Sequence, residues 1–212
     1  MAILELDNVC FSYGKTRVLN EISYTFDTGS VYSIVGKSGA GKTTLLSILS
    51  GLAAPTSGNI RYQGTDMKSI NPYTFRSKYV GVVFQSFNLL TKLTALENVI
   101  LSMDISGKKM KDKKERAYAL LESVGLSRDE ANRRVLKLSG GQQQRVAIAR
   151  ALSYEPDIIL ADEPTGNLDG ETQDEILAIL RELANHGKCV ILVTHSPAVA
   201  EQSDYVYTLK KA

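Results

Sequence analysis

The chain has 212 residues, of which 43% are hydrophobic and 23% charged, so it can build one substantial core, or one core that carries an inserted subdomain. Its 25 basic and 23 acidic side chains give a formal net charge of +2, which argues against bulk nucleic-acid binding. No apolar run approaches the ~18 residues of a membrane span, no signal-peptide pattern opens the chain, and two isolated cysteines favour a reducing, cytoplasmic setting.

The N-terminal segment is predicted to form antiparallel strands. Residues 3–13 (ILELDNVCFSY) and 18–26 (VLNEISYTF) are rich in β-branched and aromatic residues, with turns indicated near Gly14 and Gly29. Tyr13 is a candidate for stacking on a flat base; an ordinary strand aromatic is the alternative. The next run, VYSIV at residues 31–35, is typical of a buried strand.

The string GKSGAGKT follows that strand and precedes a helical stretch, TLLSILSG, which closes at Gly51. A glycine-rich turn that opens a helix leaves backbone N–H groups free to surround polyphosphate oxygens. Lys42 adds a mobile positive charge, and the Thr43 hydroxyl is the kind of ligand that Mg²⁺ prefers. The pattern therefore predicts a nucleotide site formed by Gly36, Lys37, Ser38, Gly39, Ala40, Gly41, Lys42, Thr43 and Thr44.

The middle of the chain changes from strand to helix character. YVGVVF at residues 79–84 is predicted to be a central strand, and Gln85 at its end is expected to reach a metal-bound water or the terminal phosphate. Residues 86–156 show helical spacing and no convincing strand, which predicts a helical insert. The charge run GKKMKDKKER at residues 107–116 is interpreted as the solvated start of a helix, with contact to anionic lipid headgroups as the alternative.

A second anion-binding helix start is predicted at LSGGQ, residues 138–142. Ser139 is expected to cap the helix, while Gly140 and Gly141 leave its first N–H groups open to an anion. A plain capped helix is the alternative. The chain has two phosphate-binding elements but one set of magnesium-binding carboxylates, so the second element is expected to complete a neighbour's site.

Strand character returns at residues 157–160 and 189–193, separated by a helix that stops at Gly187, which implies parallel pairing. Asp162 ends the first of these runs and is expected to hold Mg²⁺, and Glu163 is the candidate base for an attacking water. His195 ends the second and is expected to contact the γ-phosphate, with a structural histidine as the alternative. Asp169 is predicted to cap the intervening helix.

These motifs, in this order, resemble the nucleotide-binding subunits of ABC (ATP-binding cassette) transporters over essentially the whole chain. The resemblance implies the Walker A loop at residues 36–43, the Q-loop at Gln85, the signature at residues 138–142 with Gln142 as its last member, the Walker B strand with the catalytic Glu163, the D-loop at Asp169, the switch at His195 and adenine stacking by Tyr13. It also implies ATPase activity.

The fold implied by the resemblance is α/β, a P-loop NTPase (RecA-like) core with an N-terminal antiparallel β subdomain and an inserted α-helical subdomain. We expect a single ABC ATPase domain over residues 1–212. Residues 1–85 and 157–212 form the nucleotide-binding core in this interpretation, and residues 86–156 form the helical subdomain that carries the signature.

The resemblance further implies a head-to-tail homodimer, with two ATP molecules and their Mg²⁺ held between Walker A of one subunit and Ser139–Gly141 of the other. The expected partner is a transmembrane permease at the cytoplasmic face of the membrane, and no nucleic acid is expected. The apolar set Phe87, Leu89, Leu90 and Leu93 is the expected dock for the permease, with buried core as the alternative.

Within the family, the sequence looks most like the ATPases of macrolide exporters, lipoprotein-releasing systems, antimicrobial-peptide efflux systems and a cell-division ATPase of similar design. A module that regulates a membrane partner without transport is one alternative. A soluble ABC ATPase of DNA repair, translation or cluster assembly is another, which the absence of a long coiled-coil insertion and of a duplicated cassette disfavours.

Overall fold

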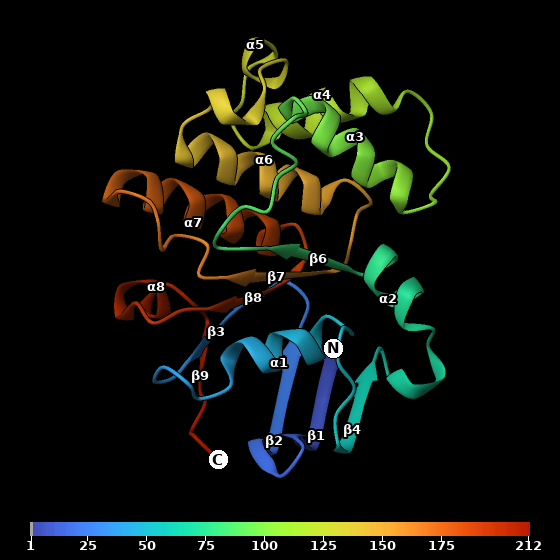
Figure 1. Cartoon of the computed structure of the whole chain (residues 1–212), viewed down its shortest axis with the longest axis vertical. Coiled ribbons are helices and arrows are strands. Elements are labelled where there is room, and N and C mark those ends of the chain that lie inside the picture. The colour runs from blue at the N-terminus through green and yellow to red at the C-terminus, as the bar shows by residue number, and fades with distance from the viewer. Residues whose placement is uncertain (1) are drawn as a thin grey trace.

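Two β-sheets of different construction frame the molecule, which a computed structural model describes over residues 2–212 (Figure 1). The smaller sheet is antiparallel and has the strand order β2-β1-β4-β5. It is made of β1 (Ala2–Tyr13), β2 (Thr16–Asp27), β4 (Ser57–Tyr62) and β5 (Thr65–Asp66). The hairpin of β1 and β2 confirms the two antiparallel strands predicted at the N-terminus.

The larger sheet is parallel and has the order β6-β7-β8-β3-β9. Its strands are β3 (Val31–Val35), β6 (Val80–Val83), β7 (Ile158–Asp162), β8 (Cys189–Val193) and β9 (Tyr205–Thr208). The central strands are buried on both faces, which is why their sequences are apolar without alternation.

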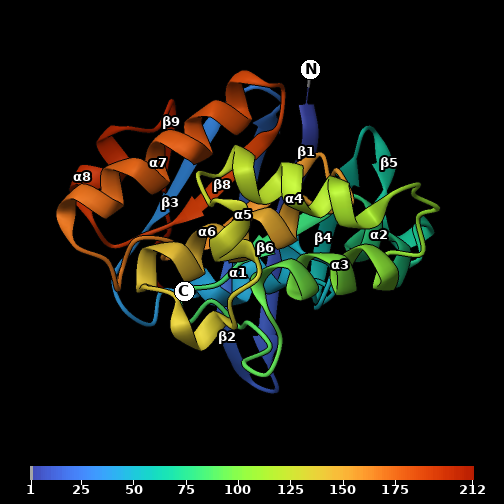
Figure 2. The same ribbon diagram turned by 90° about the horizontal axis from the view of Figure 1, so that it is seen from above.

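Helices cover both faces of the parallel sheet. Figure 1 places α1 (Lys42–Leu49) between the two sheets, and α6 (Gly140–Leu152) with α7 (Gly170–Asn185) on the opposite face. Seen from above, α3 (Ala95–Ile105), α4 (Lys113–Ser123) and α5 (Arg128–Ala131) lie over α6 (Figure 2). The remaining helices are α2 (Pro72–Lys78), α8 (Pro197–Glu201) and the 3₁₀ turns η1 (Met67–Ser69) and η2 (Val135–Lys137).

The predicted α/β fold class is confirmed, including the antiparallel N-terminal sheet and the helical insert. Between residues 86 and 156 the structure has four helices, a 3₁₀ turn and an isolated bridge between Thr94 and Arg134. None of the helices described over residues 2–212 combines the length and the apolar character needed to cross a bilayer.

The helix caps follow from side chains that satisfy otherwise unpaired N–H groups. Ser139 and Gln142 form a reciprocal capping box at the start of α6, and Asp169 caps α7, both as predicted. Ser196 is the N-cap of α8, but its side chain makes no capping hydrogen bond. Its own N–H instead donates to the Thr194 hydroxyl at 3.0 Å, which turns the chain before this short helix.

An aromatic cluster joins the antiparallel sheet to the parallel one. Phe26 of β2 is fully buried and meets the edge of Tyr32 in β3, with ring centroids 5.0 Å apart. Tyr207 of β9 stacks on Tyr24 at 4.1 Å, and its hydroxyl donates to the Thr25 carbonyl at 2.8 Å. Offset and edge-to-face aromatic contacts add to the stability from burial alone, so this cluster fixes the hairpin relative to β3.

We predict that Phe26→Ala lowers the free energy of unfolding by about 3–5 kcal/mol, because it leaves a cavity where the two sheets meet. Urea unfolding of the nucleotide-free protein measures this. Leu136→Ala, at a side chain that is 67% exposed, should change stability by less than about 0.5 kcal/mol. Equal effects of the two substitutions would contradict the role given to the cluster.

Candidate functional site

The predicted site residues follow four neighbouring strands whose carboxyl ends share one edge of the parallel sheet. Ile34 pairs with Val193, and Val193 pairs with Asp162, so β3, β8 and β7 reach this edge in the same row. Ligands of open α/β sheets gather at this edge. The structure therefore brings together the loop of residues 36–43 and the residues Gln85, Asp162, Glu163 and His195.

The loop between β3 and α1 has the backbone that the glycine pattern predicts. Gly39 and Gly41 have φ values of 77° and 95°, in the left-handed region that favours glycine. Lys42 folds over the loop, and its Nζ donates to the Gly36 carbonyl at 2.7 Å. Gly41 is the N-cap of α1 and supplies no side-chain cap, so the first N–H groups of the helix remain available to an anion.

Asp162 carries a half-buried carboxylate at the end of β7. Burial raises its pKa, the neighbouring Glu163 raises it further, and Lys42 acts in the opposite direction. Within residues 2–212 this carboxylate has neither a hydrogen bond nor an ion pair, so a cation would compensate it. Asp162, Thr43 and Gln85 offer the oxygen donors that Mg²⁺ prefers, and the donor set therefore fits this ion.

The part of the chain that the structure describes contains no cluster of three or more His, Cys, Asp or Glu side chains able to hold a metal ion.

Glu163 and His195 contact each other directly. The Glu163 Oε1 lies 2.7 Å from the His195 Nδ1, and the side chains are 14% and 71% exposed. An ionised carboxylate only accepts, so Nδ1 donates the hydrogen of this contact. The Glu163 backbone has a φ of 47° and its N–H donates to the Val193 carbonyl at 2.9 Å, which orients the carboxylate beyond the strand end.

Gln85 is exposed and lies beside the segment that follows β7. Its carbonyl accepts from the Asn167 side chain at 3.2 Å. A Cβ on Gly166 would come within 3.0 Å of the Gln85 Nε2, so the amide rests against this glycine. Sequence reasoning missed Asn167, because a single asparagine in a loop gives no periodic signal.

Tyr13 ends β1 and its side chain is 62% exposed. Its ring and that of Phe11 form an edge-to-face contact, with ring centroids 4.9 Å apart. The hairpin that carries it packs beside the phosphate-binding loop. A Cβ on Gly41 would lie 2.9 Å from the side chains of Val18 and Leu19 in β2. The structure thus places the predicted stacking residue on the element that borders this loop.

The signature residues lie elsewhere. Gly141 packs beside Thr172 of α7, the Gln142 side chain donates to Glu130 at 2.6 Å, and within residues 2–212 no hydrogen bond joins Ser139–Gln142 to residues 36–43. Asp169 accepts from the N–H and hydroxyl of Thr172, and these bonds, the N–H first, lower its pKa. The two predicted phosphate-binding elements are therefore separated within one chain.

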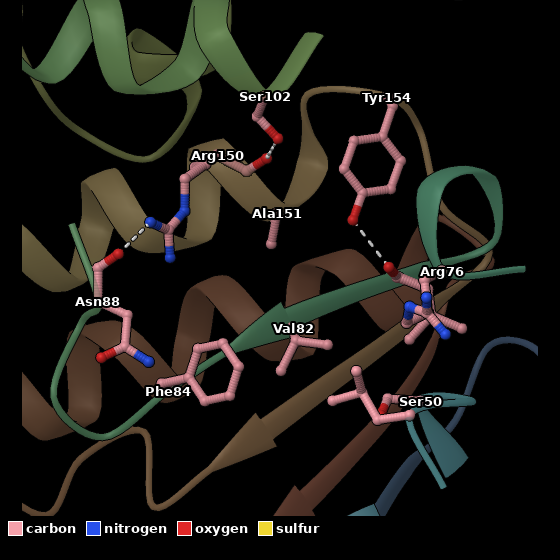
Figure 3. Close-up of a pocket in the computed structure, with 11 residues that line it drawn as sticks. Ser50, Arg76, Val82, Phe84, Asn88, Ser102, Arg150, Ala151 and Tyr154 are labelled. Carbon is pink, nitrogen blue, oxygen red and sulfur yellow. Dashed lines mark hydrogen bonds between the residues drawn. The ribbon is translucent and has the colours of Figure 1, made fainter. Parts of the chain in front are cut away.

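A groove of about 330 Å³ lies between β6, α2, α3 and α6 (Figure 3). Arg150 of α6 points along it, and its guanidinium donates to the carbonyls of Asn88 at 2.5 Å and Phe87 at 2.9 Å. Both of these residues have positive φ, at 49° and 59°. Burial lowers the pKa of Arg150. Sequence reasoning missed this residue, although a single charge within VAIARAL was a signal for it.

The four apolar residues predicted as a dock divide into two kinds. Phe87 and Leu89 pack against the core of the helical region, as the buried-core alternative expected. Leu90 is 49% exposed, and Leu93 is partly buried. The groove beside them is lined instead by Leu52, Arg76, Val82, Phe84 and Tyr154 together with residues of α3 and α6.

Sequence comparison finds that the chain is similar to ABC transporter proteins. A family model described as ABC transporter matches residues 19–166. YclH of Bacillus subtilis, an uncharacterized ABC transporter ATP-binding protein, is 47% identical over 207 residues, which cover 96% of this chain and 92% of YclH. The macrolide export ATP-binding/permease protein MacB of Salmonella choleraesuis is 44% identical over 97% of this chain, which spans 33% of MacB.

Structural comparison agrees. The dimeric structure of MJ0796, a bacterial ABC transporter cassette, matches with a TM-score of 0.87 at 38% identity, covering 98% of this chain and 94% of that one. A second dimeric structure of MJ0796, a post-hydrolysis state bound to ADP and Pi, matches equally well.

Two glycines of the phosphate-binding loop offer a matched test of its geometry. Gly39→Ala should destabilise the nucleotide-free protein by about 1–2 kcal/mol through left-handed strain alone, since its Cβ would meet no atom within 4 Å. Gly41→Ala should cost about 1–3 kcal/mol more, because its Cβ also crowds Val18 and Leu19. Urea midpoints compare them, and equal losses would contradict the close packing at Gly41.

Proposed function

This chain belongs to the ABC transporter family, as an ATP-binding subunit with ATPase activity, and we propose that two copies hydrolyse ATP at two shared sites to drive a separate membrane permease. The observation that carries the proposal is the separation of two phosphate-binding elements within one chain. The loop of residues 36–43 and the start of α6 pack on opposite faces of the parallel sheet. Neither element alone surrounds a nucleotide.

The proposed roles at the sheet edge follow from the contacts there. Glu163 takes a proton from the attacking water, and its hydrogen bond to His195 fixes the carboxylate. Lys42 and the loop N–H groups neutralise and position the phosphates, which supplies most of the acceleration in phosphoryl transfer. Mg²⁺, held by Thr43, Asp162 and Gln85, would neutralise charge on the phosphates. Tyr13 stacks on the base.

In the proposed dimer each Ser139–Gln142 segment faces the phosphate-binding loop of the other copy, and Asp169 lies beside it. Such an interface is isologous, with the same surface used by both copies. Moving an equilibrium from 1:99 open to 99:1 closed takes about 5.5 kcal/mol of differential binding, so each of two nucleotides needs to contribute about half. The dimeric MJ0796 cassette supports this arrangement.

We predict that Glu163→Gln binds ATP but hydrolyses it at least ~100-fold more slowly, the scale of losing one positioned proton-transfer group. Because ATP then persists, the variant should elute from gel filtration as a dimer with ATP and as a monomer without it. Phosphate release and elution volume are the measurements.

Glu182→Gln is the matched control, since this exposed glutamate sits near the end of α7 and should leave both readouts unchanged. Adding Ser139→Glu to Glu163→Gln should abolish the dimer while ATP still binds the monomer, because a carboxylate would oppose the partner's γ-phosphate. Near-normal turnover of Glu163→Gln would remove it from the assigned role, and an unchanged dimer in the double variant would contradict sharing.

We further propose that the permease presents a cytoplasmic helix to the groove of Figure 3, which places this chain on the cytoplasmic face of the membrane. The groove connects α6, whose start carries Ser139, with β6, whose end carries Gln85, and Arg150 ties the two together. A helix seated there contacts the end of α6 and the strand β6, the two elements that lead to Ser139 and Gln85. The relative MacB is described as a macrolide export ATP-binding/permease protein. This similarity supports the proposal of an export or extraction system.

Leu52 tests the docking, since it is 62% exposed and lines this groove. Leu52→Asp should abolish co-purification of the permease from detergent-solubilised membranes and leave the basal ATPase rate unchanged, because a charge replaces an apolar contact. Val206→Asp, at a half-exposed position on β9 away from the groove, is the control. Retention of the permease by Leu52→Asp would exclude this groove, and its identification by mass spectrometry separates transport from regulation.

A further inference from the structure

One lysine-rich segment of this chain is not used by the proposed hydrolysis. Residues 104–116 hold five lysines and one arginine against three acidic residues. Lys108 and Arg116 both pair with Glu155, and these contacts, that of Lys108 first, lower the pKa of Glu155 to about 2. Glu155 therefore stays ionised under all ordinary conditions and holds this segment in place.

Three lysines of the segment remain free of ion pairs and hydrogen bonds within residues 2–212. Lys109 and Lys111 lie in the loop between α3 and α4, and Lys114 lies in the first turn of α4. All three are exposed. Neighbouring positive charges repel one another, which disfavours such a cluster in the free protein. An anionic surface in contact with the lysines would offset this repulsion.

Exposed apolar residues border these lysines. Ile105, at the end of α3, and Tyr73, in α2, are each 59% exposed, and the Tyr73 hydroxyl donates to the Ile105 carbonyl at 3.2 Å. Lys78 of α2 is also exposed and lines a hollow with Gly107 and Lys108. We call Tyr73, Lys78, Ile105, Lys109, Lys111 and Lys114 the basic patch.

The composition of the basic patch favours one occupant. Tyrosine is enriched where one end of a ring is apolar and the other wet, as at a membrane surface. Lysines around an exposed aliphatic residue are typical of surfaces that bind anionic lipid. An acidic protein segment would use the lysines but would not require Tyr73 and Ile105 to stay exposed.

The position of the basic patch fits the same occupant. Tyr154 lines both the groove of Figure 3 and the hollow beside Lys78, so the two surfaces adjoin. The proposed function places a membrane-embedded permease at that groove, and the present inference rests on that proposal. The bilayer around the permease then lies on the side of the molecule that carries the basic patch.

We propose that the basic patch rests on anionic phospholipid headgroups, so that this chain contacts the membrane directly as well as through its permease. Each lysine close to an anionic membrane strengthens partitioning about fivefold. Lys109, Lys111 and Lys114 together contribute about a hundredfold. Tyr73 and Ile105 add apolar contact at the headgroup level.

Vesicle flotation of the purified full chain, without any permease, tests this. The vesicles are phosphatidylcholine with or without phosphatidylglycerol, at low salt. The wild-type protein should float with the anionic vesicles only, and the triple variant Lys109→Gln/Lys111→Gln/Lys114→Gln should bind them about 100-fold less tightly. The matched control, Lys15→Gln/Lys210→Gln/Lys211→Gln, removes the same charge from exposed sites elsewhere and should bind nearly as the wild type.

The possible outcomes separate this inference from the proposed function. Failure of the wild type to bind anionic vesicles overturns the inference, as does equal loss in the two triple variants, which would indicate general charge attraction. A third outcome would assign the basic patch to a protein partner instead. In it, the wild type does not bind vesicles, and the variant Lys109→Gln/Lys111→Gln/Lys114→Gln no longer retains the permease in lipid-free detergent. ATPase rates should be unchanged in both triple variants, so a negative flotation result leaves the hydrolytic assignment intact.

Discussion

The parallel pairing of β6, β7, β8 and β3 is the constraint on which the site depends. Residues far apart in the sequence reach the same place because these four neighbouring strands all end at one edge. Ordered pairing also explains why each strand is apolar on both faces, since helices cover the sheet from above and below. The fold thereby delivers polar residues to one edge of the sheet without burying them in the core.

Eight non-glycine residues of the described chain have a positive φ, and three of them lie in segments that follow the strands of the site. Glu163 leaves β7 in the left-handed region, and so do Phe87 and Asn88 after Gln85. Such conformations persist where surrounding contacts over-determine them. The Val193 carbonyl holds the first, and the guanidinium of Arg150 holds the other two. Arg150 therefore links helix α6 physically to the end of β6.

Through this link, one rigid helix serves three tasks. The start of α6 carries the segment that we assign to the partner's nucleotide, its middle packs on the parallel sheet, and its end lines the groove that we assign to the permease. In the proposed coupling, a displacement at the groove moves Ser139 and the segment after Gln85 together, because Arg150 of α6 is hydrogen-bonded to that segment. In the proposed dimer, this is how closure around ATP and movement of a membrane partner become one event.

The amino-acid sequence alone determined the chemistry of this protein and the order of its elements. Glycine spacing, capping residues and strand-end carboxylates are local features, so the backbone of the loop between β3 and α1, the caps of α6 and α7 and the α/β class could all be predicted. The sequence could not show that Phe87 and Leu89 pack against the core, that Arg150 is hydrogen-bonded to their segment, or that Ser196 leaves α8 without a side-chain cap. Only the tertiary structure decided these, and with them the separation of Ser139 from Lys42. Burial and pairing across the sheet depend on contacts between distant residues, which no local pattern contains.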